Sequence, residues 1–278
     1  MNLFAPKETI EFRGPWITNW SLPHVNQLSK LAMLSLINTA VTDRGIQRLK
    51  EAVNLTEFSM KSILISDRSM PVLCNLPQLQ SLIFWYAPRI SDKGIACLKQ
   101  RTKLSELYLA GTRATDIAIE SIIHLEGLWS LSLRNTRVTD SGIAKLSGLK
   151  HLRLITLQGN NITGRSLREL PNSPHLGLYL QKCPICDEGV IAASEQLTNL
   201  KYLDLNFTLV SDKSLHALSN LPHLEDLRLN NTSVTDAGIL NLRGHATLSS
   251  LYVENTHVTD SAIRELKEAS SNFLMIYH

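Results

Sequence analysis

Hydrophobic and polar positions recur along the chain with a fixed period. Three segments show the recurrence best, and they begin at Leu31, Leu224 and Leu248. Their shared pattern is LxxLxLxxTxVTDxGIxxL. Self-similarity with a period of roughly 20 to 50 residues is typical of repeat architectures. The pattern therefore predicts a stack of similar units instead of a single globular core.

The aspartate of this pattern marks the repeats. Most of its steps are 24 residues long, and Gly164 takes its place in one copy. We predict a degenerate repeat or cap over residues 1–30, ten repeats over 31–270, and a capping strand over 271–278. The aspartates are Asp43, Asp67, Asp92, Asp116, Asp140, Asp187, Asp212, Asp236 and Asp260.

Each repeat is expected to hold one strand and one short helix. The LxL part alternates with a period of two, which predicts a strand over residues 33–37 in the first good copy. Thr42 and Asp43 then begin a short helix, because either side chain can cap its N–H groups. Ile46 and Leu49 are three residues apart and share the inward helical face.

Two further positions have a physical role in the stack. Thr39 and its equivalents lie where the chain leaves the strand, and a hydroxyl stacked on its copy in the next repeat can serve buried backbone groups. The position two after the aspartate holds only small residues, such as Gly45, Ser69 and Ala118. Serine and alanine are poor choices for a positive φ. We therefore expect close packing between neighbouring helices there and no special turn.

The two layers require different widths. Neighbouring strands lie ~4.8 Å apart, whereas helices need roughly 10 Å. The stack must therefore bend, with a parallel sheet on the inside and helices on the outside.

The pattern resembles the leucine-rich repeats of the cysteine-containing subclass, whose usual form is LxxLxLxxCxxITDxGLxxL and which occurs in F-box adaptors. Bacterial repeat proteins with TxVTD copies are closely similar. The repeat that begins at Leu82 has the longer spacing of the cysteine-containing form. The resemblance covers roughly residues 9 to 278. It implies the α/β class: a right-handed leucine-rich-repeat solenoid (a horseshoe arc) with a concave parallel β-sheet and short convex helices, used as a binding scaffold.

Side chains that alternate with the buried leucines face the concave surface, and two groups of them stand out. Trp, Tyr and Arg dominate measured binding hot spots, so both groups are predicted to bind a partner. The first group is Ile83, Trp85, Tyr86, Tyr108 and Arg134, with Lys61 beside it. The second group is Tyr179, Tyr202, Arg228 and Tyr252, with Asp204, Asp226 and Glu254 beside it.

Each group also has a purely structural interpretation. The first can be an aromatic patch that satisfies itself, with Trp85 folded under the turn around Pro88. The second can be a set of solvated strand residues. The variant Trp85→Ala distinguishes the two interpretations of the first group, because the loss of a structural tryptophan would lower the melting temperature strongly.

The two ends and one internal stretch are less regular. We expect Trp16 and Trp20 to cover the N-terminal core, since terminal repeats carry caps. Residues 273–276 are expected to add a last strand with an apolar edge, which allows a monomer or a weak dimer through that edge. Pro171 and Pro174 predict a shortened outer helix, because proline cannot donate a backbone hydrogen bond.

Composition excludes several classes of function. The net charge is +3 and no long basic run occurs, which argues against a nucleic-acid partner. The first residues lack the features of a secretory signal, and no stretch of 18 apolar residues occurs. We therefore expect a cytoplasmic protein without membrane contact.

Candidate chemistry is sparse. Cys183 and Cys186 form a CxxC motif, but the register places them at the Thr39 and Thr42 positions, so a redox or metal role is not favoured. We place Cys74 and Cys97 in distant repeats, and four cysteines are too few for a disulfide scaffold. No catalytic motif, cofactor fingerprint or metal-ligand spacing is present.

The sequence thus predicts a non-enzymatic scaffold that binds another protein on its concave face, without cofactor or metal. One alternative is a substrate-recognition adaptor in a complex like a ubiquitin ligase, although no F-box precedes the repeats. A second alternative is a ligand-binding protein or enzyme that uses the concave face.

Overall fold

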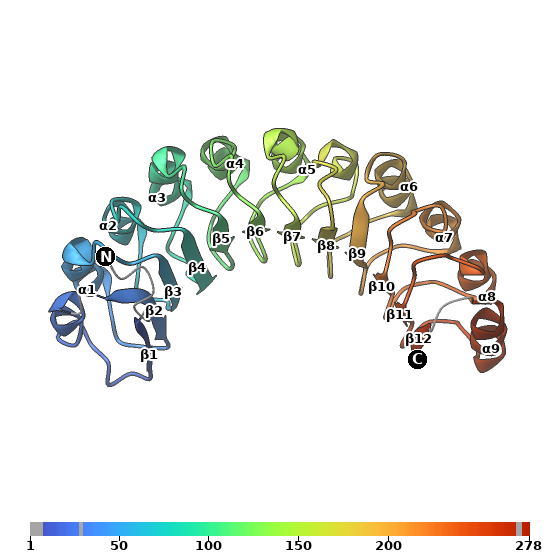
Figure 1. Cartoon of the computed structure of the whole chain (residues 1–278), viewed down its shortest axis with the longest axis horizontal. Helices are drawn as coiled ribbons and strands as arrows, with labels where there is room; N and C mark the ends of the chain where they lie inside the picture. The colour runs from blue at the N-terminus through green and yellow to red at the C-terminus, as the bar shows by residue number, and fades with distance from the viewer. Residues whose placement is uncertain (1–7, 28–29, 271–273) are drawn as a thin grey trace, which may run out of the picture. The chain divides into compact units, whose positions relative to one another are not determined.

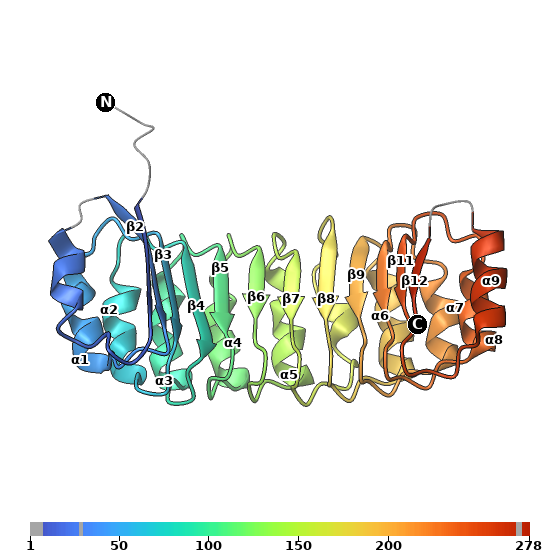
Figure 2. The same ribbon diagram turned by 90° about the horizontal axis from the view of Figure 1, so that it is seen from below.

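A computed structural model describes residues 8–27, 30–270 and 274–278. It divides into two compact units, one up to Thr136 and one from Arg137 onward. Each unit is a stack of repeats in which parallel strands form one layer and short helices the other, as Figures 1 and 2 show. The α/β solenoid with a parallel sheet is therefore confirmed.

In the first unit, each strand pairs in parallel with the next one along the chain. Its strands are β1 (Glu8–Arg13), β2 (Leu31–Ile37), β3 (Glu57–Lys61), β4 (Ser81–Tyr86), β5 (Glu106–Leu109) and β6 (Ser130–Ser132). Its helical segments are η1 (Leu22–Gln27), α1 (Asp43–Ile46), η2 (Gln47–Glu51), η3 (Asp67–Ser69), α2 (Met70–Cys74), α3 (Asp92–Ile95), η4 (Ala96–Gln100) and α4 (Asp116–Ile122).

The second unit repeats this arrangement. Its strands are β7 (Leu154–Thr156), β8 (Leu176–Tyr179), β9 (Leu200–Asp204), β10 (Asp226–Arg228), β11 (Ser250–Tyr252) and β12 (Met275–Tyr277). Its helical segments are α5 (Asp140–Ile143), η5 (Ala144–Gly148), η6 (Leu167–Glu169), α6 (Asp187–Gln196), α7 (Asp212–Leu218), α8 (Asp236–Ile239), η7 (Leu240–Leu242) and α9 (Asp260–Ala269).

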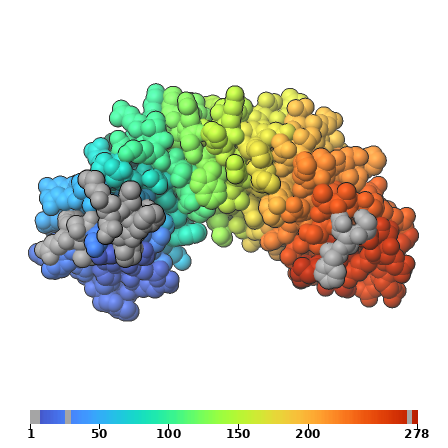
Figure 3. Space-filling view, viewed as in Figure 1, coloured from blue at the N-terminus to red at the C-terminus, as the bar shows by residue number. Residues whose placement is uncertain are grey.

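The leucines of the LxL pattern form the core of each unit. Leu34 lies opposite Phe58, and Leu82 lies opposite Leu107 in the register of the neighbouring strands. All four side chains are fully buried. In the space-filling view, side chains of successive repeats fill the space that the ribbons leave open (Figure 3). Stacking of repeats, not the single repeat, therefore buries the apolar surface.

The repeated aspartate joins one repeat to the next. Its carboxylate accepts hydrogen bonds from the backbone N–H and the hydroxyl of the Ser or Thr that precedes the following helix, and we call this pair of bonds the clamp. Either the hydroxyl or the carboxylate was expected to cap the helix. The hydroxyl does so, as when Thr115 Oγ1 accepts from Ile117 N, whereas the carboxylate forms the clamp. Clamps join Asp43 to Ser66, Asp67 to Ser91, Asp92 to Thr115, Asp140 to Thr163, Asp187 to Ser211, Asp212 to Thr235 and Asp236 to Thr259.

The clamp explains the small residue two positions after the aspartate. A Cβ added to Gly238 would lie 2.1 Å from Asp212 Oδ1 of the preceding repeat. Where serine stands instead, it joins the clamp, since Ser214 Oγ donates to Asp187 Oδ1 at 2.5 Å. The prediction of close packing without a special turn is confirmed, because Gly238 is not among the residues with positive φ.

A left-handed residue follows the strand in most repeats. Its φ is positive at Asn38, Gly111, Asn135, Gly159, Lys182, Phe207, Asn231 and Asn255. The threonine after it usually donates to the carbonyl three residues earlier, as Thr208 Oγ1 does to Leu205 O at 2.6 Å. The expected hydroxyl stack between repeats is therefore wrong, because the hydroxyls of Thr112, Thr136, Thr208, Thr232 and Thr256 each serve their own turn.

The ends differ in part from the expectation. Trp16 and Trp20 are 74% and 81% exposed, so they do not cover the N-terminal core. Instead Asn19 extends the series of clamps, since its Oδ1 accepts from Thr42 N at 2.9 Å. At the other end β12 adds the predicted last strand, while Phe273 lies outside the described residues.

The irregular stretch around Pro171 has the predicted short outer helix, the three-residue η6. Gly164 lacks a carboxylate, so Cys186 N donates to the backbone oxygen of Thr163 in place of a clamp. A Cβ on Gly189 would lie 2.7 Å from Gly164 Cα, which shows how closely the two backbones pack here.

Candidate functional site

The first predicted group lies on β4 and β5 and just after β6, and we call it the aromatic surface: Ile83, Trp85, Tyr86, Tyr108 and Arg134. Ile83 lies opposite Tyr108 in the sheet register. The rings of Trp85 and Tyr108 meet edge to face, with centroids 5.8 Å apart. The sequence-predicted neighbours are therefore brought together on adjacent strands, which Figure 2 shows side by side.

A β-bulge places Trp85 on this surface. Met60 lies opposite Phe84 and Lys61 opposite Tyr86, so Trp85 is an extra residue without a partner in the register. The bulge accounts for the 25-residue step that ends at Asp92. Because bulges re-aim side chains, Trp85 is 51% exposed and is not folded under the turn at Pro88.

The other members differ in exposure. Tyr86 is 46% exposed, whereas Ile83 is buried and can only support the surface from below. The Tyr86 ring lies against Gly111, where an added Cβ would approach Tyr86 Cδ2 to 2.4 Å. Gly111 also has a φ of +63°, so a side chain is disfavoured there on two grounds.

Charged groups flank the aromatic surface at both ends of the strands. Lys61 and Arg134 are exposed at the carboxyl ends, and Gly111 N donates to the backbone oxygen of Arg134. Glu57 and Glu106 lie at the amino ends, where Ser81 Oγ donates to Glu106 at 3.1 Å. Burial and the charge of Glu106 raise the pKa of Glu57. The strand face is therefore acidic at one end and basic at the other.

The second predicted group lies on β8 to β11, and we call it the tyrosine row: Tyr179, Arg228 and Tyr252 with Asp204. Tyr179 lies opposite Asp204, and Arg228 lies between Asp204 and Tyr252. Tyr202 belongs to the adjoining row, opposite Asp226. Sequence reasoning therefore found the correct strands but merged two rows.

Contacts within the tyrosine row satisfy most of its polar groups. Arg228 Nε donates to Asp226 Oδ1 at 2.9 Å, and its guanidinium lies 4.8 Å from the centre of the Tyr252 ring. Tyr252 stacks on Tyr277 with centroids 4.3 Å apart. The hydrogen bond to Asp226 raises the pKa of Arg228. This pairing favours the interpretation that the row stabilises the sheet.

Asp204 is a buried acid beneath the tyrosine row. Burial raises the pKa of Asp204, and this effect exceeds that of the hydrogen bonds from Gln181 and Asn206. Burial also raises the pKa of Tyr179 beside it. Neither group lies next to a nucleophile or a metal ligand set, and no group of three His, Cys, Asp or Glu suited to a metal occurs among the described residues.

Three exposed apolar side chains beyond the strand ends were not among the predicted site residues: Ile63, Phe207 and Leu209. Phe207 occupies the left-handed position that other repeats fill with Asn or Gly, and Lys182 does the same one repeat earlier. The Lys182 ammonium lies 5.4 Å from the Phe207 ring centre. The sequence signal that could have identified Phe207 is a bulky residue at a repeat position that otherwise holds Asn or Gly.

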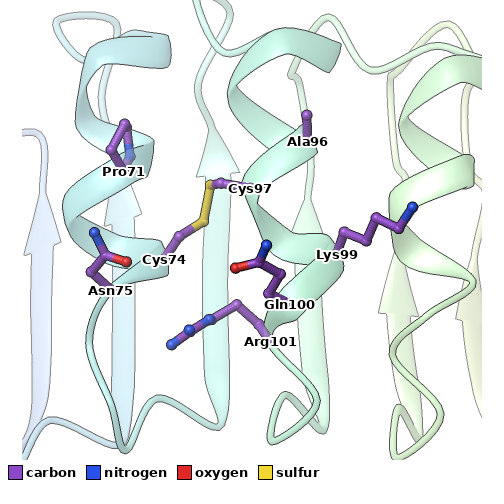
Figure 4. A pocket seen from close by; sticks show the side chains of 8 residues that line it. All are labelled: Pro71, Cys74, Asn75, Ala96, Cys97, Lys99, Gln100 and Arg101. Atoms are coloured by element: carbon purple, nitrogen blue, oxygen red, sulfur yellow. A yellow bond between two sulfur atoms is a disulfide. The ribbon is translucent and has the colours of Figure 1, made fainter.

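The cysteines divide into two pairs. Cys183 and Cys186 are free, and burial raises the pKa of the Cys183 thiol, which makes it a poor nucleophile. Cys74 and Cys97 form a disulfide, so the prediction that they belong to distant repeats is wrong. They lie in consecutive repeats on α2 and η4, beside a surface pocket of about 280 Å³ (Figure 4).

Within the part that the structure describes, none of the helices combines the length and the apolar character needed to cross a bilayer.

No protein-family model matches this sequence, and no curated protein matches it. Several solved structures share its fold. The internalin InlF of Listeria monocytogenes is 20% identical over 91% of this chain and 82% of its own, with a TM-score of 0.62. Mouse RP105, solved in complex with MD-1, is 21% identical over 89% and 42%, with a TM-score of 0.60. TLR13, solved with ssRNA13, is 19% identical over 90% and 40%, with a TM-score of 0.58. The chain is therefore a leucine-rich-repeat protein by fold.

Proposed function

We propose that the chain is a scaffold that binds another protein on its strand face, and that the aromatic surface is the main contact. The observation that carries this proposal is the exposure of Trp85 and Tyr86 beside Tyr108. A bulge presents Trp85 to solvent, although burying it would stabilise the fold by about 2 kcal/mol. Tryptophan and tyrosine in such positions dominate measured binding energies.

Fold neighbours are compatible with this proposal. RP105 was solved with MD-1, and the plant receptor RGFR1, with a TM-score of 0.52, was solved with the peptide RGF2. Both use a leucine-rich-repeat chain to hold a protein or peptide. The proposal includes no catalytic activity and no cofactor, and it places the protein in the cytoplasm.

The test compares two tryptophans of similar exposure. Trp85→Ala should weaken partner binding by about 2 kcal/mol and leave the melting temperature almost unchanged. Trp129→Ala is the matched control, because Trp129 is also exposed but lies outside the aromatic surface. Proteins that the wild-type chain captures from the source cells are identified, and their captured amounts are measured for the wild-type chain and for both variants. If the wild-type chain and Trp85→Ala captured equal amounts of the same proteins, the aromatic surface would not be the main contact.

A narrower proposal is a substrate-recognition adaptor of the cysteine-containing subclass. Cys183 supports it, because its thiol occupies the cysteine position of that subclass and lies 3.1 Å from Leu157 O. The longer repeat that begins at Leu82 supports it as well. The presence or absence of ubiquitin-ligase subunits among the captured proteins distinguishes the adaptor from a general scaffold.

A further inference from the structure

We propose that a cleft beside the aromatic surface receives an apolar side chain from an acidic segment of a protein partner. The cleft lies beyond the carboxyl ends of β2, β3 and β4, and it is lined by Asn38, Thr39, Lys61, Ser62, Ile63, Leu64 and Tyr86. This proposal rests on the proposed function and adds the chemistry of the partner.

The cleft has the size and lining of a side-chain pocket. Its volume is about 310 Å³, at the lower end of the roughly 300–1,000 Å³ that ligand pockets span. Ile63 is 59% exposed at its wall, and Tyr86 forms the side shared with the aromatic surface. Ser62 N donates to the backbone oxygen of Tyr86 at 3.0 Å, which fixes the two walls relative to each other. An aliphatic or aromatic side chain would cover apolar surface that folding leaves in water.

Thr39 supplies an unused polar group at the base of the cleft. The equivalent threonines Thr112, Thr208, Thr232 and Thr256 donate to the carbonyl three residues earlier at 2.6–2.8 Å. Thr39 is only 5% exposed, yet its hydroxyl has no hydrogen-bond partner among the described residues. A buried polar group without a partner is costly. A polar atom at the end of the incoming side chain would relieve that cost once the threonine side chain turns toward it.

The surrounding charge selects an acidic partner. Lys61, Arg89, Arg113 and Arg134 are exposed beyond the ends of β3 to β6. None of these four forms an ion pair within the described part of the chain. Segments 62–66, 87–91, 110–115 and 133–136, which hold or adjoin these cations, contain neither Asp nor Glu. Complementary charge steers association and suppresses wrong partners.

Cations beside aromatic rings also suit single-stranded nucleic acid, so the two partners must be compared. Apart from Tyr86, the cleft is lined by the aliphatic side chains of Ile63 and Leu64 and by small polar residues, which offer no stacking plane for a base. This aliphatic lining favours a protein segment over RNA.

Pooled synthetic peptides test the proposal on the full chain. Each nine-residue peptide carries Leu, Phe or Ala at its centre, with flanks of Asp, Glu, Gly and Ser in the acidic pool or of Lys, Arg, Gly and Ser in the basic pool. Fluorescence polarisation should show binding of acidic peptides with central Leu or Phe. Central Ala should weaken binding at least tenfold, and the basic pool should not bind. The proposal would be overturned if the basic pool or labelled oligouridylate bound as tightly as the acidic pool or more tightly. It would also be overturned if the acidic pool showed no binding up to about 1 mM.

Three variants locate the contact. Ile63→Asp and Lys61→Glu should each weaken acidic-peptide binding about tenfold, whereas Leu209→Asp, an exposed apolar position of the second unit, should not. Thr39→Val removes only the hydroxyl. It should unfold at an equal or higher denaturant concentration and bind the Leu and Phe peptides about as well as the wild-type chain, because these side chains carry no polar atom for the hydroxyl. Unchanged binding by both Ile63→Asp and Lys61→Glu would exclude the cleft.

The result also separates the two proposals. If Trp85-dependent capture of a protein persists while no acidic peptide binds, the scaffold proposal stands and the cleft proposal fails. If acidic peptides bind the cleft but no capture depends on Trp85, the cleft is a contact in its own right and the aromatic surface is not the main one.

Discussion

At the scale of single residues, one aspartate per repeat links each copy to the next. Asp187 accepts from Ser211 N at 2.8 Å, from Ser211 Oγ at 2.6 Å and from Ser214 Oγ at 2.5 Å. Burial raises the pKa of Asp187, but these hydrogen bonds outweigh it, and the net pKa lies below the ordinary value. The carboxylate therefore stays ionised and holds three donors that would otherwise be buried without a partner.

Removing one clamp should destabilise the chain markedly. We expect Asp187→Ala to lower the free energy of unfolding by about 2–3 kcal/mol, because hydrogen bonds to a charged group are lost and donors are left unpaired. Urea unfolding measures the change. Asp260→Ala is the matched control, since Asp260 is exposed and its carboxylate pairs with the exposed His278 in place of a clamp; its effect should stay within about 0.5 kcal/mol. Equal effects of both variants would mean that the clamp adds nothing to stability.

His245 predicts a pH dependence of stability. Its ring is buried, and its Nδ1 accepts from Leu248 N at 3.2 Å, so the proton of the neutral ring is on Nε2. Burial lowers the pKa of His245, although the nearby carbonyls of Leu221 and Leu218 oppose the shift. Below the unfolded pKa of about 6.5, the unfolded chain binds a proton that the folded chain does not. Stability should therefore fall as the pH drops from 7.5 toward 5, by at most about 1.4 kcal/mol per pH unit.

A second histidine provides the control. His245→Gln should flatten this dependence, whereas His223→Gln, at an exposed position, should retain it. Chemical unfolding at four pH values measures both slopes. If His245→Gln keeps the wild-type slope, the destabilising proton binds elsewhere.

At the scale of elements, local signals were sufficient for the strands and the helix starts. The two-residue alternation around Leu34 and the Thr42–Asp43 pair lie within one repeat. The sequence therefore predicted the strand and the start of the helix, although β2 is longer than the predicted 33–37. The clamp and the Cys74–Cys97 bond join residues of different repeats. They depend on how repeats align in space, which a period along the sequence does not specify.

The same distinction applies to the candidate site. Alternation predicted that Trp85 and Tyr108 share one face, and both lie there. For Tyr108 the direction follows from the strand itself, whereas Trp85 lies in a bulge that alternation does not predict. It could not predict that Ile83 is buried or that Ile63 opens a cleft, because both depend on the depth of packing and on the turn after β3. The exposure of Trp16 and Trp20 was missed for a related reason: both lie in a degenerate copy whose pattern does not specify how its side chains pack.

The disulfide is expected to stabilise the outer layer of the first unit. It joins α2 to η4 across 23 residues of sequence, and a closed loop of this size restricts the unfolded chain by about 3 kcal/mol. Reduction, or Cys74→Ser with Cys97→Ser, should lower the free energy of unfolding by about that amount. Thiol titration of the denatured protein should find the two thiols of Cys183 and Cys186 before reduction and four afterwards.

Four alkylated cysteines in protein that is isolated under alkylating conditions and not reduced would show that the bond does not form in the source cells. The outcome also bears on the expected cytoplasmic location, since lasting disulfides are rare in the cytosol of most organisms. Cys183→Ser is the matched control, because it removes a buried free thiol and leaves the crosslink intact.

At the scale of the whole molecule, the two units share a framework but use their strand faces differently. The first unit leaves Trp85, Tyr86 and Ile63 exposed and adds cations without paired acids. In the second, Arg228 is engaged by Asp226 and Tyr252. The repeated residues explain folding in both units. We therefore expect binding to depend on the first unit, and substitutions in the tyrosine row to affect stability more than binding.

Self-association is the last property that we predict at this scale. The described edge strand β12 exposes Met275 and Tyr277, while Ile276 is buried beneath it. An edge strand offers unpaired backbone groups to a second copy, and a charged side chain on the edge blocks such pairing. We expect light scattering to show a monomer at about 10 µM and partial dimer near 1 mM. Met275→Lys should abolish the dimer, whereas Glu268→Lys, on the exposed side of α9, should leave it unchanged. A strict monomer at the highest concentration, or a dimer that survives Met275→Lys, would show that the edge does not mediate association.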